Sequence, residues 1–194
     1  MKRFRNKYYI MRHGQAVSNV REVMSCWPET FKNHLTKVGR ETIKESAKKL
    51  KEICTKECRD IDIIFASPIA RTRQSAEIVG KAFGIKPKFD KRLMEQNAGV
   101  LNGQPVEKFR EFMGPRDARR FNMKPENGET YVDIGNRMVD FVKDIDSKYR
   151  GKNILIVSHE FPILMLRKWI EGVSNEDFYK VDRVFNKGEI RELN

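Results

Sequence analysis

The sequence predicts an α/β fold: a three-layer sandwich in which a mainly parallel open sheet carries helices on both faces. Three short, nearly continuous apolar runs, Tyr8 to Met11, Ile61 to Ala66 and Ile154 to Val157, are typical of strands buried on both sides. The segments between these runs have helical periodicity instead. Crossovers in such a sheet are right-handed, so we expect the catalytic site outside the carboxyl edge of the strands.

Four segments between the strands are predicted to be helices, each with one apolar stripe toward the sheet. The stripes are Ile43, Ala47, Leu50 and Cys54 in the first, Thr72, Ala76, Val79 and Phe83 in the second, Ile134, Met138, Phe141 and Ile145 in the third, and the run from Phe161 to Ile170 in the fourth. Thr36 is the expected cap of the first helix. Ser67 and Pro68 are expected to cap and begin the second, and Gly84 to end it.

The 194 residues fit one domain, because a chain of this length buries most of its surface in a single core. Residues 89–128 are less regular and contain four glycines and three prolines. We expect this stretch to be an insert or lid over the carboxyl edge of the sheet. The segment from Lys187 to Asn194 looks like a strand, and the sequence stops there. We therefore leave open whether the chain is an excerpt of a longer polypeptide.

The composition limits the partners and the cellular compartment. A formal net charge of +12 attracts anions, but the lysines are spread along predicted helices, so a nucleic-acid partner is possible and not favoured. No apolar run is long enough to span a bilayer, so no membrane partner is expected. Three cysteines form no secreted disulfide framework, which indicates a reducing, cytoplasmic location. Cys54 and Cys58 lack further ligands nearby, so we expect no metal and no cofactor. The oligomeric state stays open.

Polar residues follow three of the apolar runs. These are Arg12-His13-Gly14, then Ser67-Pro68 with Arg71 shortly after, and Ser158-His159-Glu160. Because strand ends meet at one edge of an α/β sheet, two arginines and two imidazoles are expected to converge. Such a group requires an anion, and arginine binds phosphoryl oxygens bidentately. Gly14 is expected to let that anion approach the backbone closely.

A phosphate in this pocket suggests a mechanism. Neutral His13 can attack phosphorus while Arg12, Arg71 and His159 stabilise the charge on the phosphoryl oxygens. A backbone carbonyl that accepts from the other imidazole nitrogen would fix the tautomer. The leaving oxygen needs a proton, and Glu95, at the start of the irregular stretch, is the better-placed acid. Glu160 is the alternative.

Five motifs follow one another along the chain: RHG at residues 12–14, HLTKVGR from His34, SPIARTRQSA from Ser67, LMEQNAGVLNG from Leu93 and VSHE from Val157. In this order they resemble the histidine phosphatase superfamily, in particular its phosphoglycerate-mutase-like branch. The resemblance implies that His13 is the phosphorylated nucleophile and that Arg12, Arg71 and His159 form the phosphate pocket. It also implies that Asn19 contacts the phosphate or substrate and that Glu95 donates the proton.

Two positions depart from the pattern of that branch. Gln15 stands where the branch often has glutamate, and we expect its side chain to lie near the substrate. Glu160 stands where the branch usually has glycine, whereas the acid-phosphatase branch often has a carboxylate there and uses it as the proton donor. Glu95 and Glu160 therefore both remain candidate donors, with Glu95 favoured because the motif around it also matches.

The sequence predicts a metal-independent phosphomonoesterase that acts on a small phosphorylated metabolite. Phosphoglycerate-mutase-type phosphoryl transfer is one alternative, and a basic phosphatase-like module appended to a larger nucleic-acid-handling enzyme is another. Specificity is expected from the loop around Trp27 and from residues 99–128. Four arginines of that stretch are candidates for a second anionic group or are plain surface charge: Arg110, Arg116, Arg119 and Arg120.

Overall fold

A central sheet with strand order β3-β2-β4-β1-β5 organises the computed structural model, which describes residues 3–180 and 185–193. The strands are β1 (Lys7–Arg12), β2 (Ile63–Ala66), β3 (Lys88–Phe89), β4 (Asn153–Ser158) and β5 (Ile190–Glu192). The β1, β2, β3 and β4 pairings are parallel, and β5 lies antiparallel to β1 at the edge. The predicted mainly parallel sheet is confirmed. A short strand does follow Lys187, and Asn194 lies outside the described residues.

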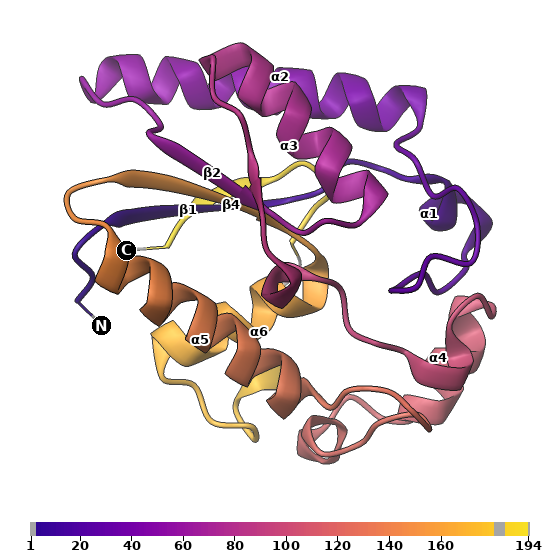
Figure 1. The fold of residues 1–194 in the computed structure, drawn as a ribbon. Coiled ribbons are helices and arrows are strands. Elements are labelled where there is room, and N and C mark those ends of the chain that lie inside the picture. The colour runs from indigo at the N-terminus through magenta and orange to yellow at the C-terminus, as the bar shows by residue number, and fades with distance from the viewer. Residues whose placement is uncertain (1–2, 181–184, 194) are drawn as a thin grey trace.

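Helices cover both faces of this sheet, as Figure 1 shows. They are α1 (Val17–Arg21), α2 (Lys37–Lys56), α3 (Ala70–Phe83), α4 (Val106–Met113), α5 (Tyr131–Lys148) and α6 (Glu160–Glu171). The α2 and α3 helices lie on one face, and α5 and α6 on the other. The three-layer sandwich is therefore confirmed. No helix in the described part of the chain combines the length and apolar character that crossing a bilayer requires.

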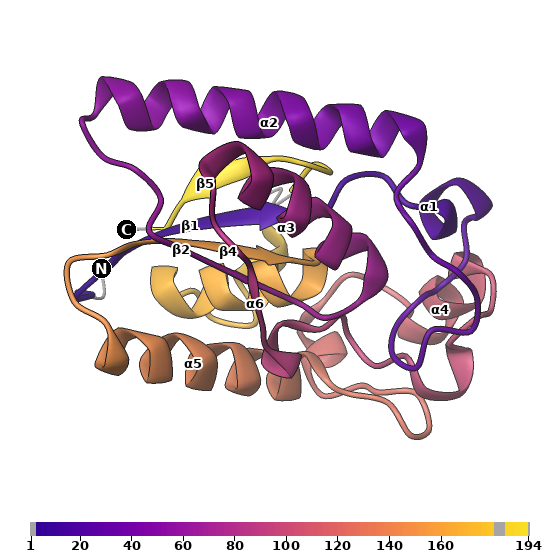
Figure 2. The ribbon, with the colours of Figure 1, turned by 45° about the horizontal axis from the view of Figure 1, so that its top comes forward.

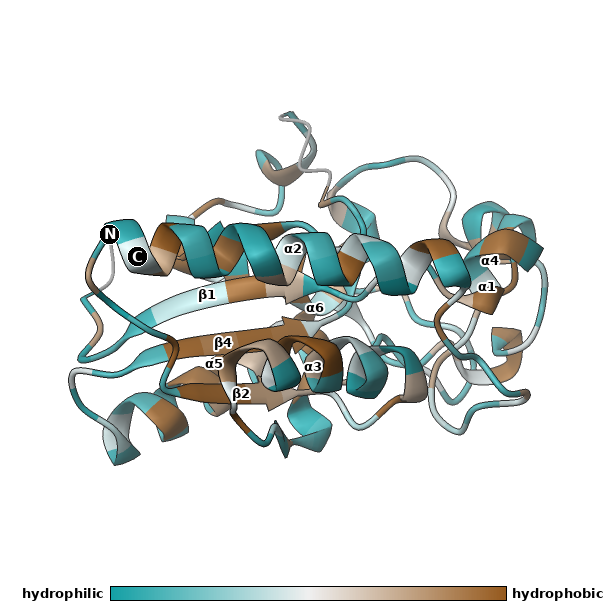
Figure 3. Cartoon of the chain, turned by 90° about the horizontal axis from the view of Figure 1, so that it is seen from above, coloured by the Kyte–Doolittle hydropathy of each residue, from teal (hydrophilic) through white to brown (hydrophobic). Residues whose placement is uncertain are grey.

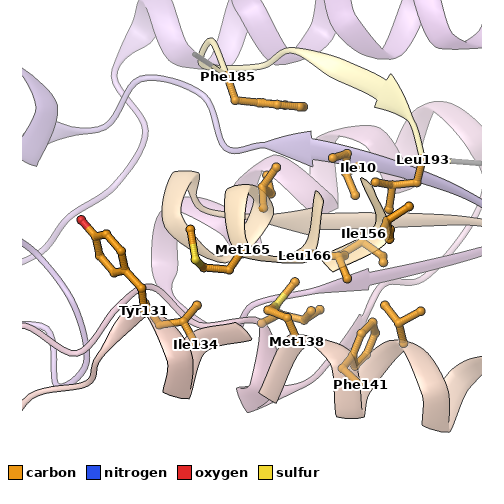
Figure 4. Close-up of a cluster of buried hydrophobic side chains, with 14 of the residues drawn as sticks. Ile10, Tyr131, Ile134, Met138, Phe141, Ile156, Met165, Leu166, Phe185 and Leu193 are labelled. Atoms are coloured by element: carbon orange, nitrogen blue, oxygen red, sulfur yellow. The ribbon is translucent and has the colours of Figure 1, made fainter. Parts of the chain in front are cut away.

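The strands β1, β2 and β4 each supply both apolar cores because their side chains alternate between the two faces. Along β4, Ile154 and Ile156 pack into the cluster under α5 and α6, whereas Leu155 and Val157 pack into the cluster under α2 and α3. Figure 4 shows the first cluster, where α5 and α6 side chains such as Met138 and Leu166 point toward the sheet. In Figure 3, β2 and β4 are hydrophobic along most of their length, while α2 alternates between hydrophilic and hydrophobic turns.

The helix caps confirm part of the sequence interpretation and correct one assignment. Thr36 caps α2, with its hydroxyl accepting from the Gly39 amide at 3.0 Å. The α3 helix begins at Ala70, two residues after Pro68, and the residue at its cap position is Ile69 and not Ser67. The Ser67 hydroxyl instead forms a hydrogen bond with His159, and the Ala70 amide donates to the distant Glu29 carboxylate at 3.2 Å.

The predicted insert, residues 89–128, contains α4 and short 3-10 helices rather than a featureless loop. Figure 2 shows α1 and α4 beyond the carboxyl ends of the strands. Backbone hydrogen bonds join the two regions: the Met24 amide donates to the Gln104 carbonyl at 2.8 Å, and the Val106 amide donates to the Glu22 carbonyl at 2.7 Å. The insert and the segment after α1 therefore form one continuous wall over the edge of the sheet.

Two glycines allow the segment after β1 to touch the start of α2. A Cβ atom on Gly39 would lie 2.0 Å from the carbonyl oxygen of Gln15, and a Cβ on Gly14 would lie 2.5 Å from the carbonyl oxygen of Gly39. Gly14 is therefore needed for the close approach of α2 to the backbone, and not, as expected from the sequence, to admit an anion.

We predict that Gly39→Ala lowers the free energy of unfolding by about 1–3 kcal/mol, because the new methyl group forces α2 away from the backbone of Gln15. Gly135→Ala is the matched control. It lies inside α5, its Cβ would meet nothing closer than 3.9 Å, and it is expected to stabilise by about 0.5–1 kcal/mol. Urea unfolding followed by circular dichroism measures both. Equal effects of the two substitutions would contradict this account.

Candidate active site

Four side chains predicted from separate parts of the sequence meet at the carboxyl edge of the sheet. Arg12 ends β1, His13 follows it, Arg71 lies in the first turn of α3, and His159 is the residue before α6. The two imidazole rings lie 5.1 Å apart between centroids, and the Arg71 Nε donates to the His13 Nε2 at 3.0 Å. His13, Arg71 and His159 are all buried. The expected convergence is present.

The hydrogen bonds of His13 define its tautomer. Its Nδ1 lies 2.7 Å from the carbonyl oxygen of Gly14, which can only accept, so Nδ1 carries the proton. Nε2 is then the nitrogen with the lone pair, consistent with its acceptance from Arg71. Burial, and then the charges of Arg71 and Arg12, hold the pKa of His13 well below its usual 6.5. His13 is therefore a neutral imidazole with an available lone pair at neutral pH.

Backbone carbonyls hold the two arginines in place. The Arg71 Nη2 donates to the carbonyl of Ser25 at 2.9 Å, and the Arg12 Nη1 donates to the carbonyl of Phe185 at 2.6 Å. These contacts fix the guanidinium groups without neutralising them, because a carbonyl carries no net charge. Neither carbonyl cancels the positive charge of the arginine that it holds.

Three buried nitrogen atoms around His13 have no hydrogen-bond partner among the described residues. They are Arg12 Nε, Arg71 Nη1 and His159 Nδ1. A buried polar group without a partner costs about 1–3 kcal/mol, and more when it is charged. Three such atoms on three separate elements indicate a site for an anionic group with several acceptor oxygens.

Glu95 is the carboxyl group beside Arg71 and His159. Its Oε2 is 3.9 Å from the Arg71 Nη2 and 3.8 Å from the His159 Nδ1, and its Oε1 accepts from the Gln96 amide at 2.9 Å. Burial raises the pKa of Glu95, although Arg71 acts in the opposite direction. A raised pKa suits a carboxyl group that donates a proton.

Two residues outside the predicted catalytic set, Arg137 and Glu129, hold the Glu95 loop. Arg137 of α5 donates to the carbonyl oxygen of Glu95 at 3.2 Å and pairs with Glu129 at 2.9 Å. Glu129 in turn accepts from the Asn97 amide at 2.9 Å. Arg137 stands among other charged residues on a helix, so nothing in its spacing distinguished it from surface charge.

Glu160, the alternative acid, takes a different position. Its Oε2 lies 2.7 Å from the Arg12 Nη2, and about a third of its side chain is exposed. It begins α6, where the helix dipole favours a carboxylate. Of the two candidate carboxyl groups, Glu95 therefore contacts Arg71 and His159, whereas Glu160 pairs with Arg12.

Of the other three predicted substrate contacts, one lines the cleft that contains His13 and two do not. Asn19 lines the same cleft as His13, and its Oδ1 accepts from the Ala16 amide at 2.9 Å. Gln15 does not line that cleft, because its Oε1 accepts from the Thr36 hydroxyl at 2.8 Å. Gly14 does not line it either, and its amide donates to the Ser75 hydroxyl at 3.2 Å. Gln15 and Gly14 thus serve the junction with α2 and α3.

The cleft has a volume of about 780 Å³ and an aromatic and a cationic lining. Its aromatic residues are Phe109, Tyr131, Phe161, Phe178 and Tyr179, and its outlying cations are Arg110, Arg116, Arg120 and Lys187. Among the predicted arginines, Arg119 is absent from the lining because it pairs with Asp117 at 2.6 Å. Trp27 is exposed and does not line the cleft, and Lys187 was not predicted because no motif surrounds it.

Among residues 3–180 and 185–193, no group of three or more histidine, cysteine, aspartate or glutamate side chains is arranged to hold a metal ion. The positive charge around His13 comes from Arg71, Arg12 and Lys187. The site can accordingly present a neutral nucleophile, several N–H donors and one buried acid to a bound anion.

Comparison with known proteins agrees with this arrangement. A family model described as the histidine phosphatase superfamily (branch 1) matches residues 8–192. Phosphoserine phosphatase 1 of Hydrogenobacter thermophilus is 26% identical over 141 residues, which cover 70% of this chain and 65% of that protein. A probable phosphoglycerate mutase of Yersinia enterocolitica is 28% identical over 173 residues, which cover 85% of this chain and 74% of that protein.

Solved structures share the fold at low sequence identity. A mycobacterial glucosyl-3-phosphoglycerate phosphatase in complex with VO3 superimposes with a TM-score of 0.80 at 20% identity, covering 96% of this chain and 91% of that one. A Bacillus stearothermophilus protein named YhfR gives a TM-score of 0.79 at 23% identity, covering 94% and 87%. The sheet with helices on both faces is common to them.

The burial of the histidines predicts a pH dependence of stability. The pKa of His159 is held well below 6.5 by burial and by Arg71, so the folded chain keeps this imidazole neutral while the unfolded chain protonates it below about pH 6.5. Stability therefore falls as the pH falls. The unmodified protein is expected to lose unfolding free energy between pH 6.5 and pH 5. We predict that His159→Asn makes this loss smaller by up to about 1.5 kcal/mol. Urea unfolding at several pH values measures this loss.

The chain offers a matched control in His34, which is exposed. The variant His34→Asn is expected to keep the pH dependence of the unmodified protein. An unchanged dependence in His159→Asn, with the control also unchanged, would show that His159 is not held neutral by the fold.

Proposed function

The chain belongs to the histidine phosphatase superfamily, and from this we propose that it is a metal-independent phosphomonoesterase that forms a phosphohistidine on His13. The observation that carries the proposal is the set of three buried nitrogen atoms without partners, Arg12 Nε, Arg71 Nη1 and His159 Nδ1, beside a neutral imidazole. A phosphoryl group offers several acceptor oxygens and negative charge, which match these donors. Relatives named phosphatases and phosphoglycerate mutases support an enzyme of this class.

In the first step, the His13 Nε2 attacks phosphorus. The nitrogen–phosphorus bond forms while the bond from phosphorus to the ester oxygen breaks. Arg71 Nε donates to this same Nε2 at 3.0 Å, so it turns to a phosphoryl oxygen as the attack proceeds. Arg12, Arg71 and His159 stabilise the charge on the phosphoryl oxygens, where most of the catalysis of phosphoryl transfer acts.

Glu95 is proposed to donate the proton to the leaving oxygen. Its raised pKa keeps a proton available, and its position beside Arg71 and His159 brings the carboxyl group to the phosphoryl site. Once the alcohol has left, ionised Glu95 accepts a proton from water, which attacks phosphorus and releases inorganic phosphate from His13. Glu160 is a weaker candidate for this role because it is engaged as an acceptor from Arg12.

The substrate is proposed to be a small phosphorylated metabolite with a second anionic group. Arg116 and Lys187 line the cleft, and neither forms a salt bridge within 4.0 Å with a described residue. Relatives include proteins named for phosphoserine and glucosyl-3-phosphoglycerate. We also infer that residues 89–128 select the substrate, because α4 supplies Phe109 and Arg110 to the lining. These residues and the rest of the chain are proposed to form one domain.

Phosphoglycerate-mutase-type transfer is a second candidate, favoured by the relatives that carry that name. The two reactions share the attack by His13 and differ in whether water or a substrate hydroxyl takes the phosphoryl group. With 3-phosphoglycerate, release of inorganic phosphate without the isomer supports the phosphatase. Isomer appearing faster than phosphate assigns the mutase.

We predict that the protein hydrolyses 4-nitrophenyl phosphate in the presence of EDTA and that His13→Ala abolishes this activity. Labelling with a phosphorylated substrate is expected to give an acid-labile, base-stable phosphoryl group at position 13. His34→Ala, at an exposed histidine, is the matched control and should keep full activity. Full activity in His13→Ala would refute the proposed mechanism.

The proton donor is tested by the leaving group. We predict that Glu95→Gln lowers kcat about 10²–10⁴-fold with an alkyl phosphate, whose leaving oxygen needs a proton, and much less with 4-nitrophenyl phosphate. Steady-state kinetics of both substrates measure the difference. If the loss that depends on the leaving group occurs in Glu160→Gln and not in Glu95→Gln, the donor is Glu160.

A further inference from the structure

We propose that Glu160 is a built-in competitor of phosphate at Arg12, which weakens the hold of the site on phosphate and promotes release of the product. This inference rests on the proposed phosphatase function. It gives Glu160 a positioning role that differs from proton donation: its carboxylate occupies the Arg12 guanidinium when no phosphoryl group is bound.

The geometry places the carboxylate where it competes. Glu160 Oε2 lies 2.7 Å from Arg12 Nη2, and Arg12, Glu160 and His13 line the same cleft. The Arg12 side chain is largely buried, so a phosphoryl group that reaches it also approaches Glu160. Two anions that share one guanidinium repel each other, and the repulsion is strong where water is partly excluded.

Glu160 is not required to hold Arg12 in position. The Arg12 Nη1 donates to the carbonyl of Phe185 at 2.6 Å, and the backbone of Arg12 is paired in the β1–β4 ladder opposite Ser158. The ion pair with Glu160 is therefore an addition to an arginine that is already anchored. Its main effect is on the charge of the site.

The positive charge of the site explains why a competing carboxylate promotes the release of phosphate. Arg12, Arg71 and Lys187 are the cations of the cleft whose charges act on His13, and burial strengthens their attraction for an anion. Each proposed cycle ends with inorganic phosphate in this cationic site, and product release often limits turnover. One carboxylate beside Arg12 reduces the attraction at the step where phosphate has to leave.

The position of Glu160 also allows its carboxylate to leave Arg12 when phosphate binds and to return when phosphate leaves. It starts α6, a helix of twelve residues whose dipole holds a carboxylate near its N-terminus. About a third of the side chain is exposed, so the carboxylate can turn toward water when phosphate binds Arg12. An ion pair with this exposure contributes little to stability, so replacing Glu160 by phosphate at Arg12 costs little free energy.

The test compares Glu160→Gln with a matched variant, Glu111→Gln. Glutamine keeps the size and one acceptor oxygen of Glu160, removes the negative charge and replaces the second oxygen with an NH2 group. Glu111 of α4 lines the same cleft, is exposed, and has no ion pair with a described residue. Isothermal titration with inorganic phosphate at pH 7 and low salt gives the Kd of each protein. Steady-state kinetics give KM, kcat and the inhibition constant for phosphate.

We predict that Glu160→Gln lowers the Kd for inorganic phosphate about tenfold, while Glu111→Gln changes it less than twofold. KM and the inhibition constant for phosphate are expected to fall with the Kd, and kcat is not expected to rise. A merely structural role of Glu160 predicts the opposite sign, because a displaced Arg12 binds phosphate more weakly. Thermal unfolding confirms that both variants are folded.

The outcomes separate this inference from the proposed function. If the unmodified protein binds phosphate and hydrolyses phosphate esters, but Glu160→Gln binds phosphate equally or more weakly, the competitor role is wrong and the phosphatase stands. If the unmodified protein neither binds phosphate nor hydrolyses any ester, the proposed function itself is wrong.

Discussion

The site depends first on the parallel pairing of β1 with β4. In this register Arg12 lies opposite Ser158, and the His13 amide donates to the Ser158 carbonyl at 3.1 Å. The pairing brings His13 beside His159, although 146 residues separate them in the chain. A shift of one residue would move every side chain of β1 to the opposite face of the sheet. The apolar alternation of β1 and β4 between two cores therefore also fixes the distance between the two imidazoles.

A second constraint is the manner in which the positive charges are held. Arg71 and Arg12 are each anchored by a backbone carbonyl, Ser25 and Phe185 respectively, and His13 is oriented by the carbonyl of Gly14. A dipole fixes the direction of a donor and leaves its charge in place. Carboxylates in the same positions would cancel the field that lowers the pKa of His13. Glu160, which does pair with Arg12, is partly exposed and lies at the border of the group.

Much of the fold could be predicted because it depends on local pattern. The buried strands follow from continuous apolar runs, and α2 follows from Thr36 and the stripe that includes Ile43 and Leu50. The convergence of Arg12, His13, Arg71 and His159 followed from the rule that parallel strands end at one edge. That rule needs no knowledge of individual contacts, which is why it succeeded.

What the sequence did not reveal depends on contacts between distant residues. Gly14 fits against Gly39, Ser67 bonds His159 instead of capping α3, and Gln15 bonds Thr36. Each of these partners is set by how α2 and α3 pack on the sheet, and no spacing in a single sequence encodes that packing. Arg137 and Lys187 belong to the same class, because a cation in the site and a cation on the surface have identical local surroundings in sequence.

The anchoring of Arg12 has a consequence for biosynthesis. The Phe185 carbonyl accepts from its guanidinium, and the Gly188 amide donates to its backbone carbonyl at 3.0 Å. Ribosomes make β1 before α1 and reach Gly188 only after α6. A nascent chain can thus acquire strands β1–β4 and helices α1–α6 while Arg12 still lacks the support of Phe185 and Gly188. The anchoring of Arg12 therefore comes after the synthesis of Arg71, Glu95 and His159.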